Sequence, residues 1–85
     1  MQTFAEHYQI TDCEHEGDIK NAINEVETAG GIFDKVINFP KDNADEIDDY
    51  YESQEWFVQF HCNSLDDLKA TREKLHIYNI KKSRK

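Results

Sequence analysis

The chain has 85 residues and a formal net charge of −8, with 38% hydrophobic and 33% charged residues. This length predicts a single domain. The longest apolar run falls well short of the roughly 18 residues that a membrane span needs, and the N-terminus lacks the basic and then apolar pattern of a secretory signal. Two cysteines are too few for a disulfide scaffold. We therefore expect a cytoplasmic protein whose thiols are reduced.

The charges are unevenly distributed along the chain. Residues 1–80 contain all 18 carboxylates and six Lys or Arg residues, a balance of −12, and the last five residues return four positive charges. We predict one α+β domain over residues 1–80 and a basic C-terminal tail over residues 81–85. An acidic body repels nucleic-acid phosphates and anionic membranes, and it favours a basic protein partner. Solubility alone is the competing explanation of the charge.

The first part of the chain predicts a strand and a helix. Phe4, Tyr8 and Ile10 share one parity, which is typical of a strand with one buried face, and we expect it to begin near His7. Asp18 is predicted as the N-cap of the helix that follows. The apolar side chains behind it recur at helical spacing, at Ile19, Ala22, Ile23, Val26 and Ala29. Gly30 and Gly31 are expected to end this helix.

The middle of the chain predicts a second strand and then a long polar connection. Residues 32–39 are apolar on both parities, and Pro40 is expected to stop the strand. Residues 41–55 are dense in Asp and Glu, with Ile47, Tyr50 and Tyr51 as the large apolar side chains. A polar connection of this length between neighbouring strands is unusual, and such segments often carry function or disorder.

The last part predicts a strand, a helix and a final strand. Trp56, Val58, Phe60 and Cys62 share one parity and should face the core. Asn63 or Ser64 is expected to cap a second helix, with Asp66 and Asp67 at its positive end. Its apolar stripe is predicted from Leu65, Leu68 and Leu75, with Thr71 or Arg72 lying along it. Residues 76–80 are read as the closing strand because Ile77, Tyr78 and Ile80 suit one.

This order of elements predicts a ferredoxin-like β-α-β-β-α-β sandwich, with a four-stranded antiparallel sheet and two helices on one face. The first and third strands should lie side by side in the middle of the sheet. The other face of the sheet should be free. Many unrelated functions use this fold, so the fold by itself predicts no activity.

A metal or thiol site is one hypothesis. Cys13 and His15 would share a strand face, and one of His61 and Cys62 would join them if the first and third strands are neighbours, because these two successive residues point to opposite faces. At most three ligands result, whereas a structural zinc site takes four. A nucleophilic role for Cys62 is opposed by Asp66 and Asp67, whose charges disfavour a thiolate. We therefore predict no catalytic residues, no metal and no cofactor.

RNA binding through the free sheet face is a second hypothesis. Phe57 stands where this fold can stack a base, and His61 shares its face. The basic and aromatic motif of RNA-recognition domains is absent, and a body charge of −12 opposes binding to phosphates. We therefore predict no direct contact with nucleic acid and no contact with membranes.

Docking of a protein is the preferred hypothesis. Carboxylates would steer the encounter with a basic partner, and aromatic side chains would supply the buried contact. This character is similar to that of small acidic decoy inhibitors of nucleic-acid enzymes, many of them encoded by phages, although no motif matches. The predicted contact residues are Asp42, Asp45, Glu46, Asp48, Asp49, Tyr50, Tyr51, Glu52, Glu55 and Phe57.

The sequence thus predicts a small, acidic, non-enzymatic binding module that inhibits or regulates a nucleic-acid-handling protein. A solvated connection, with its tyrosines covering the free sheet face, is the competing explanation of residues 41–55. The alternative functions are a small-molecule-sensing regulatory domain that acts as a homodimer and a Cys/His metal or thiol protein. A homodimer paired through an open sheet edge is the alternative partner.

Overall fold

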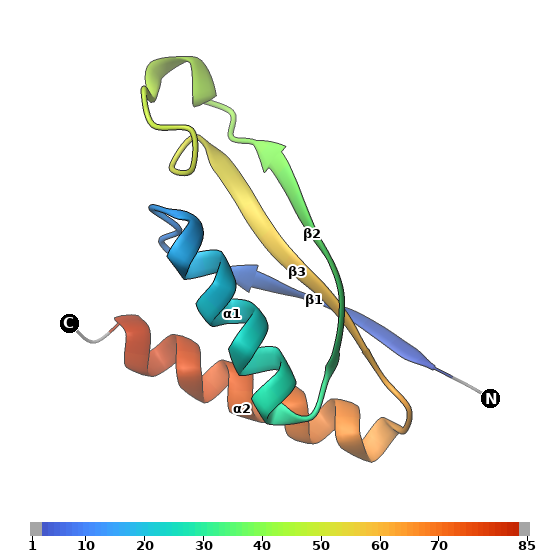
Figure 1. Cartoon of the computed structure of the whole chain (residues 1–85). Coiled ribbons are helices and arrows are strands. Elements are labelled where there is room, and N and C mark those ends of the chain that lie inside the picture. The colour runs from blue at the N-terminus through green and yellow to red at the C-terminus, as the bar shows by residue number, and fades with distance from the viewer. Residues whose placement is uncertain (1–2, 84–85) are drawn as a thin grey trace.

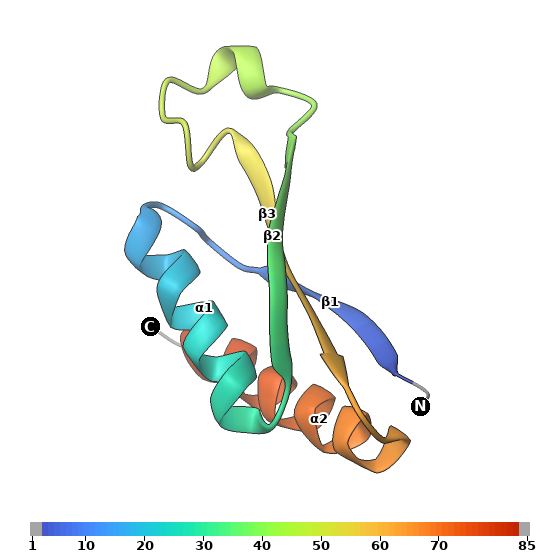
Figure 2. The same ribbon diagram turned by 45° about the vertical axis from the view of Figure 1, so that its right-hand side comes forward.

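A computed structural model describes residues 3–83 (Figure 1). Its elements are β1 (Phe4–Ile10), α1 (Glu16–Ala29), β2 (Ile32–Pro40), a 3-10 turn η1 (Ala44–Glu46), β3 (Gln54–Cys62) and α2 (Leu65–Ser83). The strands form one antiparallel sheet in the order β1-β3-β2. Both helices cover one face of this sheet (Figures 1 and 2). The predicted α+β class is confirmed, as is the pairing of the first and third strands.

The predicted fourth strand is wrong, and with it the four-stranded ferredoxin-like sheet. Residues 76–80 continue α2, which runs without a break to Ser83. No glycine or proline follows Pro40 in the chain, so nothing in this segment terminates a helix once it has begun. Tyr78 packs against the core three residues beyond Leu75, and Ile77 and Ile80 are exposed. As a result β1 lies at an edge of the sheet and not at its centre.

The first helix begins earlier than the sequence indicated. His15 is its N-cap, and Asp18 lies three residues inside. The Asp18 carboxylate nevertheless satisfies the entry to the helix, because it accepts hydrogen bonds from the backbone N–H groups of Glu14 (2.8 Å) and His15 (3.3 Å). Gly30 ends the helix in the left-handed conformation (φ 109°), as predicted. The buried stripe of α1 is Ile19, Ala22 and Val26.

The centre of the core is β3. Trp56, Val58, Phe60 and Cys62 are buried beneath the helices, and this confirms the predicted alternation. The remaining buried core side chains come from β1, from both helices and, at Cys13, from the turn between β1 and α1. Ser64 caps α2 as one of the two predicted residues, because its hydroxyl accepts the N–H of Asp67 (3.1 Å). The stripe of α2 is Leu68, Thr71 and Leu75, so neither Leu65 nor Arg72 belongs to it.

The second strand departs from simple alternation. A β-bulge between Phe33 and Lys35 places Phe33 and Val36 on the helix-facing side, opposite Phe60 and Val58. Ile37 lies on the other side of the sheet, opposite Phe57 of β3. The strand β2 ends at Pro40, which is itself its last residue; an edge strand tolerates a proline at this position. The first strand also begins at Phe4, earlier than the predicted His7.

Two further features bear on the sequence predictions. Within residues 3–83, neither helix is long and apolar enough to cross a membrane. Residues 81–83 of the predicted tail are the last residues of α2, and Arg84 and Lys85 lie outside the described residues.

Tyr8 ties β1 to α2, because its hydroxyl donates to Asn79 Oδ1 (2.7 Å). Burial raises the pKa of Tyr8 far above its ordinary value, with the Tyr78 and Glu25 side chains adding to the effect.

Candidate functional site

The acidic connection forms the far end of the β2–β3 hairpin. Pairing between these strands continues to Pro40 and Gln54, beyond the last β1 pair at Ile10 and Trp56. The hairpin therefore projects past β1, and the loop stands clear of both helices (Figures 1 and 2). The Lys41 N–H donates to the Ser53 carbonyl (2.9 Å) and closes the loop at its base. We call residues 41–55 the acidic loop.

Hydrogen bonds within the acidic loop give it a defined path. In its first half, the N–H of Ile47 reaches the carbonyl of Ala44 (3.1 Å) across the turn η1. In its second half, the Ser53 hydroxyl donates to the Tyr50 carbonyl (2.8 Å), and the Glu52 N–H donates to Asp49 Oδ1 (3.0 Å). These bonds satisfy backbone groups that an irregular loop would leave to water. The carboxylates of the loop are thereby presented from a structured backbone.

The carboxylates of the loop are exposed, and they form no ion pair with the side chains that the structure describes. Seven of them against Lys41 give residues 41–55 a charge of −6, most of the net charge of the chain. All seven side chains are exposed, namely those of Asp42, Asp45, Glu46, Asp48, Asp49, Glu52 and Glu55. Among the residues that the structure describes, the four ion pairs formed involve none of these seven. The loop is therefore a concentrated source of negative potential.

The aromatic side chains of the loop pack on the helix-facing side of the sheet. Tyr51 stacks on Trp56 with ring centroids 5.5 Å apart, and Trp56 Nε1 donates to the Tyr51 carbonyl (2.9 Å). Tyr50 meets both rings edge-on, at 5.4 and 5.8 Å, and is 61% exposed. Tyr51 thus anchors the loop, and Tyr50 offers its ring to solvent. The expectation that these tyrosines cover the free sheet face is wrong.

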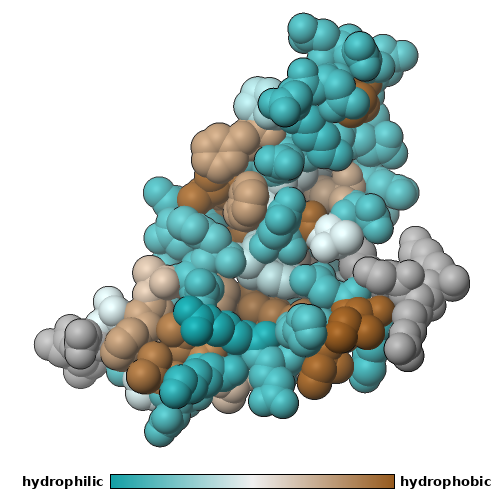
Figure 3. Space-filling view, turned by 180° about the vertical axis from the view of Figure 1, so that it is seen from behind, coloured by the Kyte–Doolittle hydropathy of each residue, from teal (hydrophilic) through white to brown (hydrophobic). Residues whose placement is uncertain are grey.

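Phe57 lies apart from the other predicted contact residues. It points to the free face of the sheet, where its ring meets Phe39 at 6.0 Å in an edge-on arrangement. Phe39 is 55% exposed. Figure 3, which views the molecule from behind, shows apolar side chains gathered on this face beside the hydrophilic loop. The predicted residues therefore form two surfaces, one on each side of the hairpin. The sequence pattern places Phe39 only in a strand, because no local signal indicates that its side chain is exposed.

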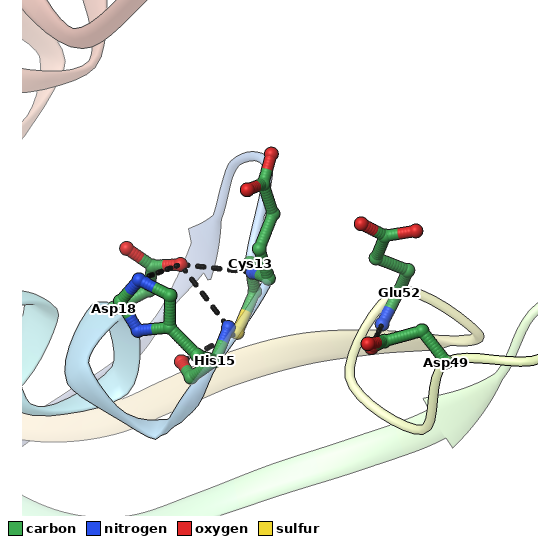
Figure 4. A network of polar contacts seen from close by, with 6 residues as sticks. Cys13, His15, Asp18, Asp49 and Glu52 are labelled. Atoms are coloured by element: carbon green, nitrogen blue, oxygen red, sulfur yellow. Dashed lines mark hydrogen bonds and ion pairs between the residues drawn. The ribbon is translucent and has the colours of Figure 1, made fainter.

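A hollow separates the acidic loop from the turn between β1 and α1. It has a volume of about 570 Å³. Asp12 and Glu14 line it from the turn, and Glu52, Glu55 and Lys41 line it from the loop. Figure 4 shows Glu52 and Asp49 on one side and Cys13 and His15 on the other. Four carboxylates and one ammonium make this hollow suited to a cationic side chain. Asp12 and Glu14 were not predicted, since only the antiparallel pairing brings them here.

The predicted Cys/His constellation does not assemble. The strands β1 and β3 are neighbours, but they are antiparallel, with Phe4 opposite Cys62 and Ile10 opposite Trp56. Cys13 follows the far end of β1, so about 20 Å of sheet separates it from Cys62. His15 caps α1, and His61 Nδ1 lies 2.8 Å from Asp34 Oδ1. Within residues 3–83, no group of three His, Cys, Asp or Glu side chains is arranged to hold a metal ion.

Comparisons of the chain with protein-family models, with curated proteins and with solved structures found no match.

Proposed function

We propose that this protein is a non-enzymatic binding module that docks a basic protein through the acidic loop. The exposure of seven loop carboxylates, without a cationic partner among the side chains described in residues 3–81, carries the proposal. Mutual repulsion of like charges on one loop destabilises the isolated protein, and a basic partner relieves that repulsion. The loop also projects from the body, so an extended groove can receive it without contact with the helices.

The division of labour within the loop supports this proposal. Tyr51 is held by Trp56, which keeps the backbone in place before binding and lowers the entropy cost of docking. Tyr50 is exposed beside the carboxylates, and exposed tyrosines are frequent anchors of interfaces. The hollow lined by Asp12, Glu14 and Glu52 accepts a Lys or Arg side chain of the partner.

The partner class that fits this surface is a nucleic-acid-handling protein. Its binding groove carries Lys and Arg side chains arranged for phosphates, and spaced carboxylates on a projecting loop compete for them. In this proposal the protein inhibits or regulates its partner by occupying the groove. Binding is therefore mutually exclusive with nucleic acid and weakens as the salt concentration rises.

The test compares two variants of equal net charge. The loop variant carries Asp45→Asn, Glu46→Gln, Asp48→Asn and Asp49→Asn. The matched control carries Glu16→Gln, Glu27→Gln, Asp66→Asn and Glu73→Gln, all exposed positions on the helices. Each protein is immobilised and used to capture nucleic-acid-binding proteins from a lysate of the source cell, with elution by salt and, separately, by duplex DNA or RNA.

The proposal predicts that the wild type and the control capture the same nucleic-acid-binding protein, which free nucleic acid releases. The loop variant should lose this capture. Equal capture by the loop variant, or equal loss in the control, contradicts docking through the loop. Capture that nucleic acid does not displace leaves the loop as a docking site but contradicts the partner class.

A further inference from the structure

The outer edge of β1 has no strand beside it. Within residues 3–83, the sheet order β1-β3-β2 gives the β1 backbone a strand partner only in β3. A fourth strand would lie along this edge in a ferredoxin-like sheet, but residues 76–83 are helical. The strand order places β1 at the margin of the sheet, and Figure 2 shows the two helices together on one side of the strands. A row of unpaired N–H and C=O groups is a template for another strand.

The two edges of the sheet differ in how they resist pairing. The edge strand β2 has a bulge between Phe33 and Lys35, and Pro40 at its end. A bulge, a lysine and a proline are the usual means of blocking edge-to-edge association. By contrast, β1 pairs with β3 over seven consecutive residues without a bulge and contains neither lysine nor proline. Its one charged residue, Glu6, is paired with Arg72 of α2.

A groove runs between β1 and α2 beside this edge. Its volume is about 280 Å³, and Phe60 and Leu75 form its apolar lining. The charged groups are the Glu6–Arg72 pair, accompanied by His7 and His76. This side is thus close to neutral in a chain of net charge −8. A second acidic copy can approach here with less repulsion than at the acidic loop.

We propose that β1 pairs antiparallel with β1 of a second copy, so that the two sheets join into one sheet of six strands. With the two-fold axis at His7, Phe4 lies opposite Ile10 of the other copy and Glu6 lies opposite Tyr8. His7 then lies opposite its own copy at the axis, and no carboxylate of β1 faces another carboxylate, which suits a self-complementary strand. This pairing is a property of the chain additional to docking through the acidic loop.

The helices reinforce the same pairing. The axis that relates two antiparallel strands is perpendicular to the sheet, so the helices of both copies lie on the same face. Because α2 packs beneath β1 and β3, the α2 helices of the two copies then lie side by side, with their axes near the 8–10 Å apart that is usual for packed helices. Ile80 lies four residues beyond His76, on the side of α2 that lines the groove, and is 42% exposed in the single chain. It becomes buried between the two helices.

The expected interface is of modest size. Seven residues of strand extend over about 24 Å, and together with the paired helices they bury about 1,000 Å² in total. This area is at the lower limit of specific interfaces, so self-association should be of micromolar strength. Sedimentation equilibrium from micromolar to millimolar protein should therefore show a monomer–dimer transition.

The discriminating variant is His7→Lys. His7 is exposed on the free sheet face, and the two lysines would meet across the proposed axis. The dissociation constant of the dimer should rise at least about tenfold. The matched control is Gln59→Lys, which adds the same charge directly opposite His7 on the central strand, away from the edge. It should leave dimerisation unchanged. Circular dichroism of both variants establishes that each is folded.

A mixture supplies a second readout. The His7→Lys and His7→Glu variants should each dimerise weakly alone and recover dimerisation when mixed. A His7→Cys variant should also form a disulfide-linked dimer on mild oxidation, since Cys13 and Cys62 are buried. A monomer throughout the concentration range would overturn the proposal. So would a dimer that is indifferent to His7→Lys, or one that Gln59→Lys disrupts equally, which would point to the free sheet face.

Discussion

Replacement of Thr71 by valine tests how the two helices are joined. The Thr71 side chain is fully buried, and its hydroxyl donates to the carbonyl of Ala29 at the C-terminal end of α1 (3.2 Å). The Sγ atom of Cys62 lies 3.7 Å from the hydroxyl oxygen of Thr71. Since the hydroxyl proton is directed to Ala29, the thiol acts as the donor to Thr71. Valine keeps the shape of the side chain and removes both interactions.

The magnitude follows from two opposing effects. Loss of the hydroxyl leaves the Ala29 carbonyl without its side-chain donor, which costs about 1–2 kcal/mol at a partly buried site. The added methyl group returns a fraction of the roughly 0.8 kcal/mol that burial of such a group provides. We expect Thr71→Val to lower the free energy of unfolding by about 1 kcal/mol. Thr71→Ser, which keeps the hydroxyl but opens a methyl-sized cavity, should cost a similar amount.

Urea unfolding followed by circular dichroism measures this effect. With a slope near 1 kcal/mol per molar urea for a domain of this size, the midpoint should fall by about 1 M. The matched control is Thr28→Val on the exposed side of α1, which should leave the midpoint nearly unchanged. A Thr71→Val protein as stable as the wild type would refute the reasoning, because the hydroxyl would then contribute nothing beyond its volume.

Three further predictions concern other parts of the fold. Gly31→Ala should destabilise the protein by about 1–3 kcal/mol in urea unfolding, since a Cβ there would lie 2.9 Å from Phe60 Cδ2; an unchanged midpoint would contradict this close packing. Ile77→Ala should change stability by less than about 0.5 kcal/mol, because Ile77 is exposed on a helix, whereas a loss above 2 kcal/mol would favour a buried strand. The folded-state pKa of Tyr8 is raised above its unfolded value near 10, so its contribution is complete below pH 10 and is lost as the pH rises above it, by up to about 1.4 kcal/mol per pH unit. Tyr8→Phe should therefore show a shallower loss of stability between pH 10 and 11, and equal slopes in the two proteins would exclude Tyr8 as the source.

Sequence patterns were sufficient where a signal was local. The glycine pair at Gly30 stops α1 because a left-handed residue can be supplied there without strain. Ser64 caps α2 for an equally local reason. The alternation around Phe60 identified β3, since period-two burial is a property of the strand itself. The density of Asp and Glu in residues 41–55 likewise predicts that these side chains are exposed, as the structure shows.

The candidate site was only partly accessible from sequence. The run of acidic residues identified the loop, but it did not indicate which of the predicted contact residues lie on which face of the hairpin. Phe57 follows Trp56 directly, and successive strand residues point to opposite faces, so Phe57 meets Phe39 while Trp56 meets the loop tyrosines. Asp12 joins the hollow from about 40 residues away in the chain, through the antiparallel register of β1 and β3.

The sequence by itself therefore determined the class of fold, the core strand, the helix boundaries that glycine and serine mark, and the acidic character of one loop. The tertiary structure decided which way residues 76–80 went, because Ile77, Tyr78 and Ile80 suit a strand or a helix equally well. A helix that nothing interrupts keeps its hydrogen bonds, and Tyr78 then reaches the core beside Leu75. The same choice left β1 at the edge of the sheet, since the residues that would have paired with it were already satisfied within α2.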